Sequence, residues 1–376
     1  MTTSGLTRTC AGLAGAALLI GTLVPAATAS AKEPPSASAA ESPSTSTAIA
    51  WRRTIENTLT AMRGEALAHA SYHFYGEQAG YEHLPKVRAL FAKTAHTELH
   101  DHFTKEAQLI HYVRDDAANL RRSIAGEMEE ATRTYPRFAK EAREDKDYNA
   151  ARLFTELAGD ERSHARNFAK ALYAITHHRG EIPEGPTVDP VKVVAGKPKV
   201  HSARTLRNLE TALRGESFAN ASYTLYAEHA RARSPRLAQL FERTAAVELT
   251  EHFAELANLA GYVHRTRENL RRSIAGETYE ATKMYPGFAR TAREERAYRA
   301  AALFTEIAGD EAAHARAFAY ALKHLHHHGH HGKHEQHGQH GQHGQHGQHG
   351  QQSQQSQGQQ GQQGQQSQHH MMGSDF

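Results

Sequence analysis

Acidic side chains and a histidine recur at helical spacing in residues 121–172, where they interrupt an apolar stripe. Glu127 and Glu130 are three residues apart, and so are Glu161 and His164. This spacing stacks each pair on one face of a helix, here the face that the apolar residues turn inward. Moving an unpaired carboxylate from water into an apolar interior costs at least several kcal/mol. Acids that face inward therefore need protons, cations or a metal ion. A metal centre is the interpretation that suits them best.

The same pattern returns 150 residues later, in residues 271–322, so the chain contains two copies of one unit, about 54–177 and 204–325. A single glutamate on a helix is usually a solvated surface residue, but here a whole set is repeated. Five carboxylates and a histidine per copy suit a pair of Fe or Mn ions better than a four-ligand Zn site. We expect Glu127 and Glu277 to be central ligands. The predicted ligands are Glu65, Glu98, Glu127, Glu130, Glu161 and His164 in the first copy, and Glu216, Glu248, Glu277, Glu280, Glu311 and His314 in the second.

Each copy reads as four helices with no strand signal, which predicts an all-α fold with one four-helix bundle per site. Pro136 and Pro286 fall inside the third helix and should kink it without necessarily ending it. The expected boundaries are a first helix at about 52–79 that ends at Gly80, a second that starts at Pro85, a third capped by Asp116 or Thr266, and a fourth that begins near Asp147.

Four motifs make both copies resemble the rubrerythrins, a family of ferritin-like diiron proteins. They are R-G-E (63–65, 214–216), I-A-G-E-x-x-E (124–130, 274–280), Y-P-x-F-A-x-x-A-R-E (135–144, 285–294) and I/L-A-G-D-E-x-x-H-A (157–165, 307–315). The resemblance implies two ferritin-like bundles, two diiron centres held by the twelve residues named above, and peroxide- or O2-dependent oxidoreductase chemistry (peroxidase or ferroxidase). It also places four tyrosines close to the metals: Tyr72, Tyr135, Tyr223 and Tyr285.

The sequence departs from the family in two respects. The family carries Glu-x-x-His on its second helix, whereas Asp101 and Glu251 stand at that position here and His102 and His252 follow one residue later. Either pair could complete the sites, the histidines only through a change of helix phase. The second departure is that Cys10 is the only cysteine, so a rubredoxin domain with its four-cysteine iron is missing. Electrons must come from an unknown donor or from Fe(II) itself.

The two ends of the chain differ in composition from the repeats. Residues 1–31 have the pattern of an export signal, with a short polar start, an apolar core and the A-x-A-type site at 27–29, which predicts an exported, extracytoplasmic protein without a membrane anchor after cleavage. Residues 32–50 and 179–202 read as linkers, which leaves repeats at 51–178 and 203–325. The charged residues alternate in sign and do not form a nucleic-acid-binding surface. Whether copies of the chain assemble into a homo-oligomer stays open.

Residues 326–376 are rich in His, Gln and Gly, and this composition predicts a disordered tail. Clustered imidazoles bind Zn, Cu, Ni or Fe weakly. An alternative function is therefore sequestration of iron or another metal outside the cytoplasm without catalysis. A repeat expansion without selected function is the simpler explanation of the tail.

The connection between the second and third helices bears on how the repeats close. In a ferritin-like bundle these helices run parallel, so the connection must travel ~30 Å for ~20 residues of helix. About six residues, between Ile110 and Asp116, are left for it, and they reach roughly 20 Å. The alternative is that helix pairs are exchanged: Glu65 and Glu98 would then lie with the acids of 277–314, and Glu216 and Glu248 with those of 127–164.

Overall fold

The structure, a computed structural model, describes residues 51–325, and the regular elements in that range are helical. The first repeat has four long helices, and the second and third of them are each divided by a local change of pitch. Its elements are α2 (Arg52–Tyr81), α3 (Pro85–Thr97), η1 (Glu98–Phe103), α4 (Thr104–Leu109), α5 (Asp116–Glu129), η2 (Glu130–Thr134), α6 (Tyr135–Glu144) and α7 (Tyr148–His177).

The second repeat follows the same order after an extended segment at 178–202. Its elements are α8 (Ala203–Ala230), α9 (Pro235–Val247), η3 (Glu248–Phe253), α10 (Ala254–Ala260), α11 (Thr266–Tyr279), η4 (Glu280–Met284), α12 (Tyr285–Glu294) and α13 (Tyr298–His324). The predicted export signal, the first linker and the His-rich tail lie outside the described residues. Among the described helices, none combines the length and the apolar character needed to cross a membrane.

Most helix boundaries follow local signals in the sequence. Pro85 and Pro235 stand in the first turns of α3 and α9, where the missing N–H costs nothing. The cap expected at Asp116 is one residue earlier, because Asp115 accepts the hydrogen bond from Ala118 N and Asp116 is already helical. Likewise α2 runs through Gly80 to Tyr81, since glycine is tolerated inside a helix that is held by packing.

The segments η1 to η4 are π-helical turns, and each begins at a predicted ligand: Glu98, Glu130, Glu248 and Glu280. A π turn inserts one extra residue into a helix and so rotates everything after it. The turns η2 and η4 end two residues before Pro136 and Pro286, and the helix continues through both prolines. The π turns therefore set the direction of the side chains around the predicted sites.

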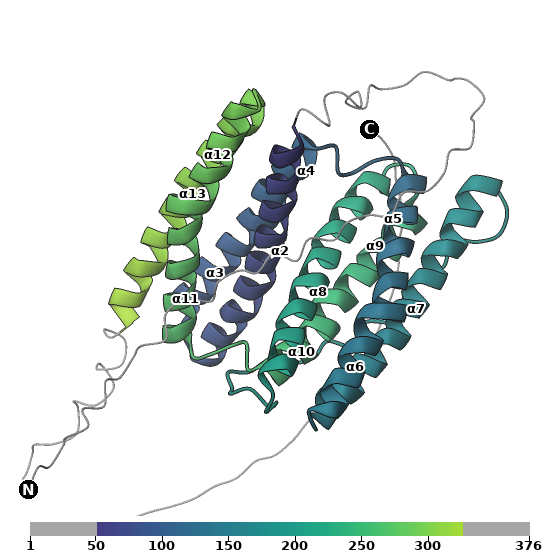
Figure 1. Cartoon of the computed structure of the whole chain (residues 1–376), viewed down its shortest axis with the longest axis horizontal. Coiled ribbons are helices and arrows are strands. Elements are labelled where there is room, and N and C mark those ends of the chain that lie inside the picture. The colour runs from purple at the N-terminus through teal and green to yellow at the C-terminus, as the bar shows by residue number, and fades with distance from the viewer. Residues whose placement is uncertain (1–50, 326–376) are drawn as a thin grey trace, which may run out of the picture. The chain divides into compact units, whose positions relative to one another are not determined.

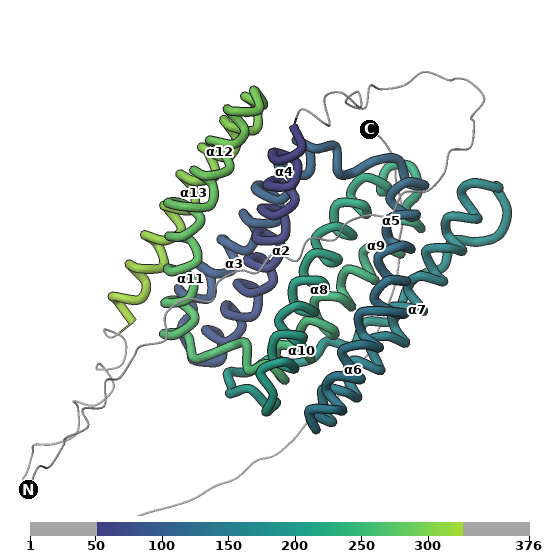
Figure 2. Tube along the Cα trace, in the orientation of Figure 1, coloured from purple at the N-terminus to yellow at the C-terminus, as the bar shows by residue number. Residues whose placement is uncertain are grey.

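The helices form two bundles, each built from parts of both repeats. Figure 1 shows α11, α12 and α13 beside α2 and α3, and α5, α6 and α7 beside α8, α9 and α10. The phenol of Tyr72 on α2 donates a hydrogen bond to Glu277 on α11, while that of Tyr223 on α8 donates to Glu127 on α5. Figure 2 traces how the short turn after α4 carries the chain from one bundle into the other. In the structure, each bundle thus combines the first helix pair of one repeat with the second pair of the other.

The N-terminus of each leading helix is held by the turn between the last two helices of its own bundle. Glu295, between α12 and α13, accepts hydrogen bonds from the backbone N–H groups of Arg53 and Thr54 at the start of α2. Asp147, between α6 and α7, accepts from the backbone of His201 and Ser202 before α8. Glu295 thus satisfies donors of α2 that have no partner within the helix, and Asp147 fixes the residues that lead into α8.

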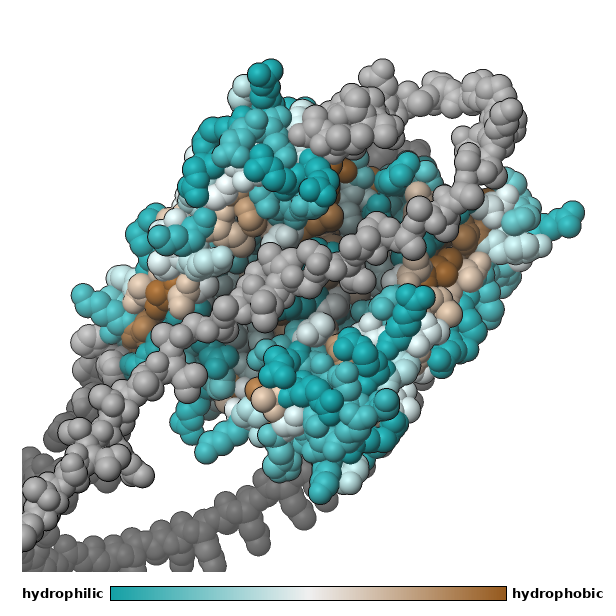
Figure 3. Space-filling model, viewed as in Figure 1, coloured by the Kyte–Doolittle hydropathy of each residue, from teal (hydrophilic) through white to brown (hydrophobic). Residues whose placement is uncertain are grey.

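The segment 178–202 runs along the second bundle and is bound to it through backbone hydrogen bonds from Val191, Gly196 and Lys199. Gly261 lies under this crossing with φ +58, and a Cβ there would come within 2.3 Å of the backbone of Lys197. Glycine is required at this position by both conformation and space. The face seen in Figure 3 is mostly hydrophilic, with separate hydrophobic areas.

Candidate metal centres

Each bundle encloses one cluster of carboxylates and histidines. The first, which we call the Glu65 site, consists of Glu65 on α2, Glu98 and His102 on η1, Glu277 on α11, Glu280 on η4, and Glu311 and His314 on α13. The second, the Glu216 site, consists of Glu216 on α8, Glu248 and His252 on η3, Glu127 on α5, Glu130 on η2, and Glu161 and His164 on α7. Every glutamate that these sites take from the long α-helices is almost fully buried.

In the Glu65 site, donor atoms converge on two neighbouring points. The Nδ1 atom of His102 lies 2.9 Å from Glu98 Oε2, 3.0 Å from Glu311 Oε1 and 3.5 Å from Glu65 Oε2. The Nδ1 atom of His314 lies 3.2 Å from Glu98 Oε1, 2.9 Å from Glu311 Oε2 and 3.4 Å from Glu277 Oε2. Glu98 and Glu311 therefore take part at both points, one oxygen at each.

The Glu216 site repeats this geometry with its own residues. The Nδ1 atom of His252 lies 2.9 Å from Glu248 Oε2, 3.2 Å from Glu161 Oε1 and 3.5 Å from Glu216 Oε2. His164 Nδ1 lies 3.1 Å from Glu248 Oε1, 3.0 Å from Glu161 Oε2 and 3.5 Å from Glu127 Oε2. Here Glu161 and Glu248 are the shared pair. The central position expected for Glu127 and Glu277 thus belongs to other glutamates.

These donor sets fit a pair of metal ions. A metal ion about 2.1 Å from its ligands holds neighbouring donors ~3.0–3.4 Å apart. The separations above, 2.9–3.5 Å, are close to this range. Both carboxylate oxygens of Glu98 and of Glu248 are buried without a hydrogen-bond partner, as are Glu161 Oε1 and Glu311 Oε1. Buried polar atoms are rarely left unpaired, so a group of neighbouring unpaired oxygens of this kind is suited to holding a cation.

The pKa values of the cluster residues are also consistent with sites for metal cations. Burial raises the pKa of Glu216 and of Glu277 to about 8, although hydrogen bonds from His252 and His314 oppose this. Burial alone would lower the pKa of His314, but its bonds to Glu277, Glu311 and Glu98 raise it to about 12. The metal-free cluster must therefore hold protons, and metal ions would displace them on binding.

All four predicted tyrosines lie against the clusters. Tyr285 donates to Oε1 of Glu65 and Tyr72 to Oε1 of Glu277, while Tyr135 and Tyr223 do the same for Glu216 and Glu127. In every case the other carboxylate oxygen, Oε2, is the one that faces the cluster. Each tyrosine thus fixes the orientation of one terminal carboxylate.

The structure separates the alternatives left open for the second helix. His102 and His252 are buried in the clusters, whereas Asp101 is paired with Lys105 at the surface and Glu251 accepts a hydrogen bond from Asp189 N. The cause is the π turn at Glu98 and Glu248, which brings the residue four positions later, not three, onto the ligand face.

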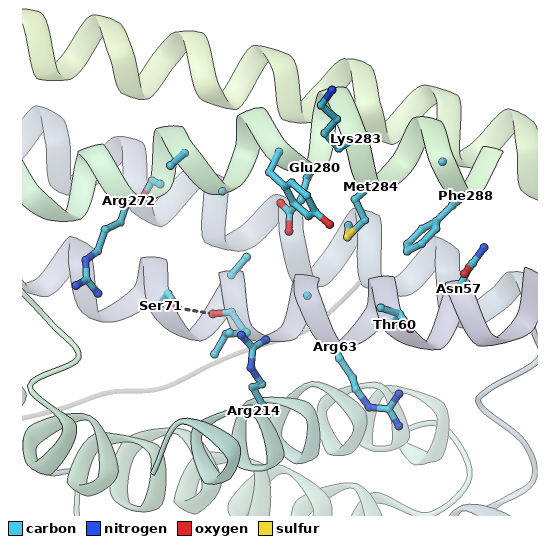
Figure 4. Close-up of a pocket in the computed structure, with 18 of the residues that line it drawn as sticks. Asn57, Thr60, Arg63, Ser71, Arg214, Arg272, Glu280, Lys283, Met284 and Phe288 are labelled. Carbon is cyan, nitrogen blue, oxygen red and sulfur yellow. Dashed lines mark hydrogen bonds between the residues drawn. The ribbon is translucent and has the colours of Figure 1, made fainter. Parts of the chain in front are cut away.

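Glu130 and Glu280 lie at the edge of their clusters, outside the two four-residue groups of each site. The carboxylate of Glu280 is next to Gly64, and that of Glu130 is next to Gly215, where a Cβ would be 3.0 Å from Glu130 Oε1. Glu280 also lines a cavity of about 1150 Å³ together with Tyr72, and Glu130 lines one of about 560 Å³ with Tyr223. Figure 4 shows Glu280 among the residues that line the first cavity, and Arg63, Arg214 and Arg272 line other parts of it. These cavities connect the clusters to open space.

Sequence reasoning missed three acidic residues near the clusters. Asp310 Oδ2 lies 3.6 Å from His102 Nε2, and Asp160 Oδ2 lies 3.8 Å from His252 Nε2, so a carboxylate stands behind each histidine. In the sequence, Asp160 and Asp310 could have been recognised because each directly precedes a predicted ligand in a repeated G-D-E motif. The third residue is Glu106, which is fully buried beside Tyr285. Its counterpart in the second repeat is Leu256, so the repeated pattern of acidic residues does not include it.

Comparison with known proteins agrees with this geometry. The family model described as rubrerythrin matches residues 56–172, 118–194, 207–268, 250–322 and 268–337. The chain is 37% identical over 140 residues to the rubrerythrin of Porphyromonas gingivalis, which covers 34% of this chain and 70% of that protein. It is 35% identical over 157 residues to the nigerythrin of Nitratidesulfovibrio vulgaris, covering 38% of this chain and 77% of that protein. No solved structure matches the chain.

Proposed function

The chain belongs to the rubrerythrin family, and from this premise we propose that it is a non-haem diiron oxidoreductase that reduces peroxide or O2 at two composite sites. The observation that carries the proposal is the pair of clusters in which two histidines and four glutamates converge, with unpaired buried oxygens at the shared positions. Such a donor set, rich in carboxylates with a few imidazoles, is suited to iron, and Mn is the other metal that it would accept.

Two iron ions in each cluster would supply electrons and Lewis acidity to a bound oxidant. The chain's own residues would hold these ions and orient the carboxylates that bind them. Glu98 and Glu311 face both points of the Glu65 site, while His102 and His314 each face one. Tyr285 and Tyr72 hold the outer glutamates by one oxygen, which leaves the other oxygen for the metal. The ligand set is therefore fixed before an oxidant arrives, which reduces the cost of reorganisation during reaction.

Access for a small oxidant is through the cavities at Glu280 and Glu130. The first is lined by Tyr72, Gly64 and several arginines, the second by Tyr223 and Gly215. Such openings admit peroxide or O2, and burial of the remaining ligands limits the entry of bulk water. Electrons must arrive from a partner protein or from Fe(II), because the single cysteine of the chain cannot hold a rubredoxin-type iron.

Two further parts of the proposal, export of the protein and metal capture by the tail, are supported by the sequence alone. The pattern of residues 1–31 supports export, and the histidines after Leu325 support weak metal capture beside the bundles. Both segments lie outside the described residues. Proteolytic mapping of the mature N-terminus in culture supernatant, and metal binding by the tail as a separate peptide, test these two additions.

Catalysis is tested with the chain truncated after Leu325 and loaded anaerobically with Fe(II). We expect multiple turnovers of peroxide when a reductant is supplied, and loss of that activity when Glu98 and Glu248 are both changed to Gln. Iron that binds in full but oxidises no faster than free Fe(II) would contradict the proposal and favour sequestration. The tail-deleted chain is needed because iron bound loosely by histidines would otherwise contribute to both readings.

A further inference from the structure

The two sites differ at one buried position. Glu106 on α4 is fully buried in the bundle that holds the Glu65 site, and the corresponding residue on α10 is Leu256, also fully buried. The remaining members of the two sites match pair by pair. In both sites, corresponding helices of the two repeats supply glutamates, histidines and tyrosines at the same spacing. The Glu65 site therefore has one carboxyl group more than the Glu216 site.

The contacts of Glu106 assign a proton to it. Oε1 of Glu106 lies 2.9 Å from the phenol oxygen of Tyr285, and the same phenol oxygen is hydrogen-bonded to Glu65 Oε1. A tyrosine hydroxyl has one proton and can donate it to only one of the two carboxyl groups. The other contact is a hydrogen bond only if its carboxyl group is protonated and donates to the phenol oxygen. Because Glu65 faces the metal point through Oε2 and must be ionised to bind metal, the proton belongs on Glu106.

The surroundings of Glu106 favour its neutral form. Its second oxygen, Oε2, is buried without a hydrogen-bond partner, which an ionised carboxylate would tolerate poorly. Burial raises the pKa of Glu106 well above its usual value; Tyr285 and His102 lower it, and Glu311 and Glu98 raise it further. Tyr135, the counterpart of Tyr285, meets only Glu216, because Leu256 offers no polar atom.

We propose that Glu106 is a protonated carboxylic acid that is connected to Glu65 through the hydroxyl group of Tyr285, and that it makes the Glu65 site the one with its own proton store. Transfer along this path moves the proton of Tyr285 to Glu65 Oε1 and that of Glu106 to Tyr285. Glu65 would then give up its proton to the oxidant and return to a carboxylate, so that the phenol is restored and Glu106 is left as a carboxylate. Reduction of peroxide to two water molecules consumes two protons and two electrons, and Glu106 can provide one of those protons without solvent. This use of the proton rests on the proposed function; the protonation of Glu106 does not.

The test is infrared difference spectroscopy on the full chain loaded with Fe(II) under anaerobic conditions at neutral pH. Subtraction of the Glu106→Gln spectrum from that of the wild type should leave the carbonyl stretch of one protonated carboxylic acid, and this band should shift in D2O. Tyr285→Phe should move the band to higher frequency, since it removes the hydrogen-bond partner. Tyr135→Phe is the matched control from the other bundle and should leave the band in place.

A gain-of-function variant guards against misfolding of the loss variants. Leu256→Glu should add a second band of the same kind, which a further Tyr135→Phe change shifts. Absence of the band from the difference spectrum of wild type and Glu106→Gln, in variants with wild-type circular dichroism, overturns the proposal. If the band is present but oxidation of the Glu65 site is equally fast in Glu106→Gln, the proton store is not used. Neither result depends on whether peroxide is turned over repeatedly, so failure of the proposed function is recognised separately.

Discussion

His69 provides a prediction in which the two repeats serve as each other's control. Its ring Nδ1 donates a hydrogen bond of 2.8 Å to the backbone oxygen of Ala95. At the matching place in the second repeat, Asn220 donates from Nδ2 to the backbone oxygen of Ala245 at 2.7 Å. Burial lowers the pKa of His69 from 6.5 to about 4, against the opposing effect of the hydrogen bond. The folded protein therefore favours the neutral ring.

The sign and size of the effect follow from proton linkage. The unfolded chain binds a proton at His69 below about pH 6.5 and the folded chain only below about pH 4, so stability is lost as the pH falls between these values. At about pH 5 the loss amounts to about 2 kcal/mol relative to pH 7.5. His69→Asn should keep the hydrogen bond, as Asn220 does, and remove this part of the acid sensitivity.

Urea unfolding of the metal-free chain, followed by circular dichroism at about pH 7.5 and about pH 5, measures the effect. Other buried groups also respond to acid, but they are common to all variants and cancel in the comparison. The reciprocal change Asn220→His should make the protein more acid-sensitive by a similar amount. If His69→Asn loses as much stability as the wild type over this interval, the buried neutral histidine is not the cause and the reasoning is refuted.

Three further predictions concern the sites and the pairing of the bundles. Glu127→Ala and Glu277→Ala should each reduce bound iron to about half while helical content stays at the wild-type level, because alanine is the better helix former. Iron analysis together with circular dichroism measures both quantities. A double variant that still binds the full complement of iron would show that the prediction is wrong. Gly215→Ala should weaken iron binding, since its Cβ would stand 3.0 Å from a carboxylate oxygen, whereas Gly64→Ala, with 3.6 Å of room, should be tolerated; equal effects in iron titrations would count against this. Glu295→Ala should lower the free energy of unfolding by about 1–2 kcal/mol through loss of the cap on α2, and an unchanged urea midpoint would argue that these partners do not share a bundle.

The fold class and most residues of the two clusters could be predicted because their signals are local. Helical periodicity, Pro85 at a helix start and the i, i+3 pairs such as Glu161 and His164 are properties of short stretches. The length of the turn between α4 and α5 carried information about the pairing of helices as well, since six residues limit the distance that a chain can cross.

The remaining features depend on the third dimension. The sequence does not decide between His102 and Asp101, because a π turn cannot be recognised from helical spacing, which assumes one constant pitch. The shared positions of Glu98 and Glu311 depend on which helices face each other across the bundle. The sequence does not single out Glu106, because a lone glutamate without a counterpart in the second repeat resembles a surface residue. Only its burial beside Tyr285 distinguishes it.

The account stands on two metal pairs per chain, each held by helices of both repeats. The most direct measurement is the iron content of the chain ending at Leu325 after anaerobic loading and removal of loosely bound metal. We predict about four irons per chain, in keeping with two donor sets of two points each. A value near two would mean that one of the clusters does not bind metal, and a value near zero would contradict the assignment of these buried carboxylates as diiron ligands.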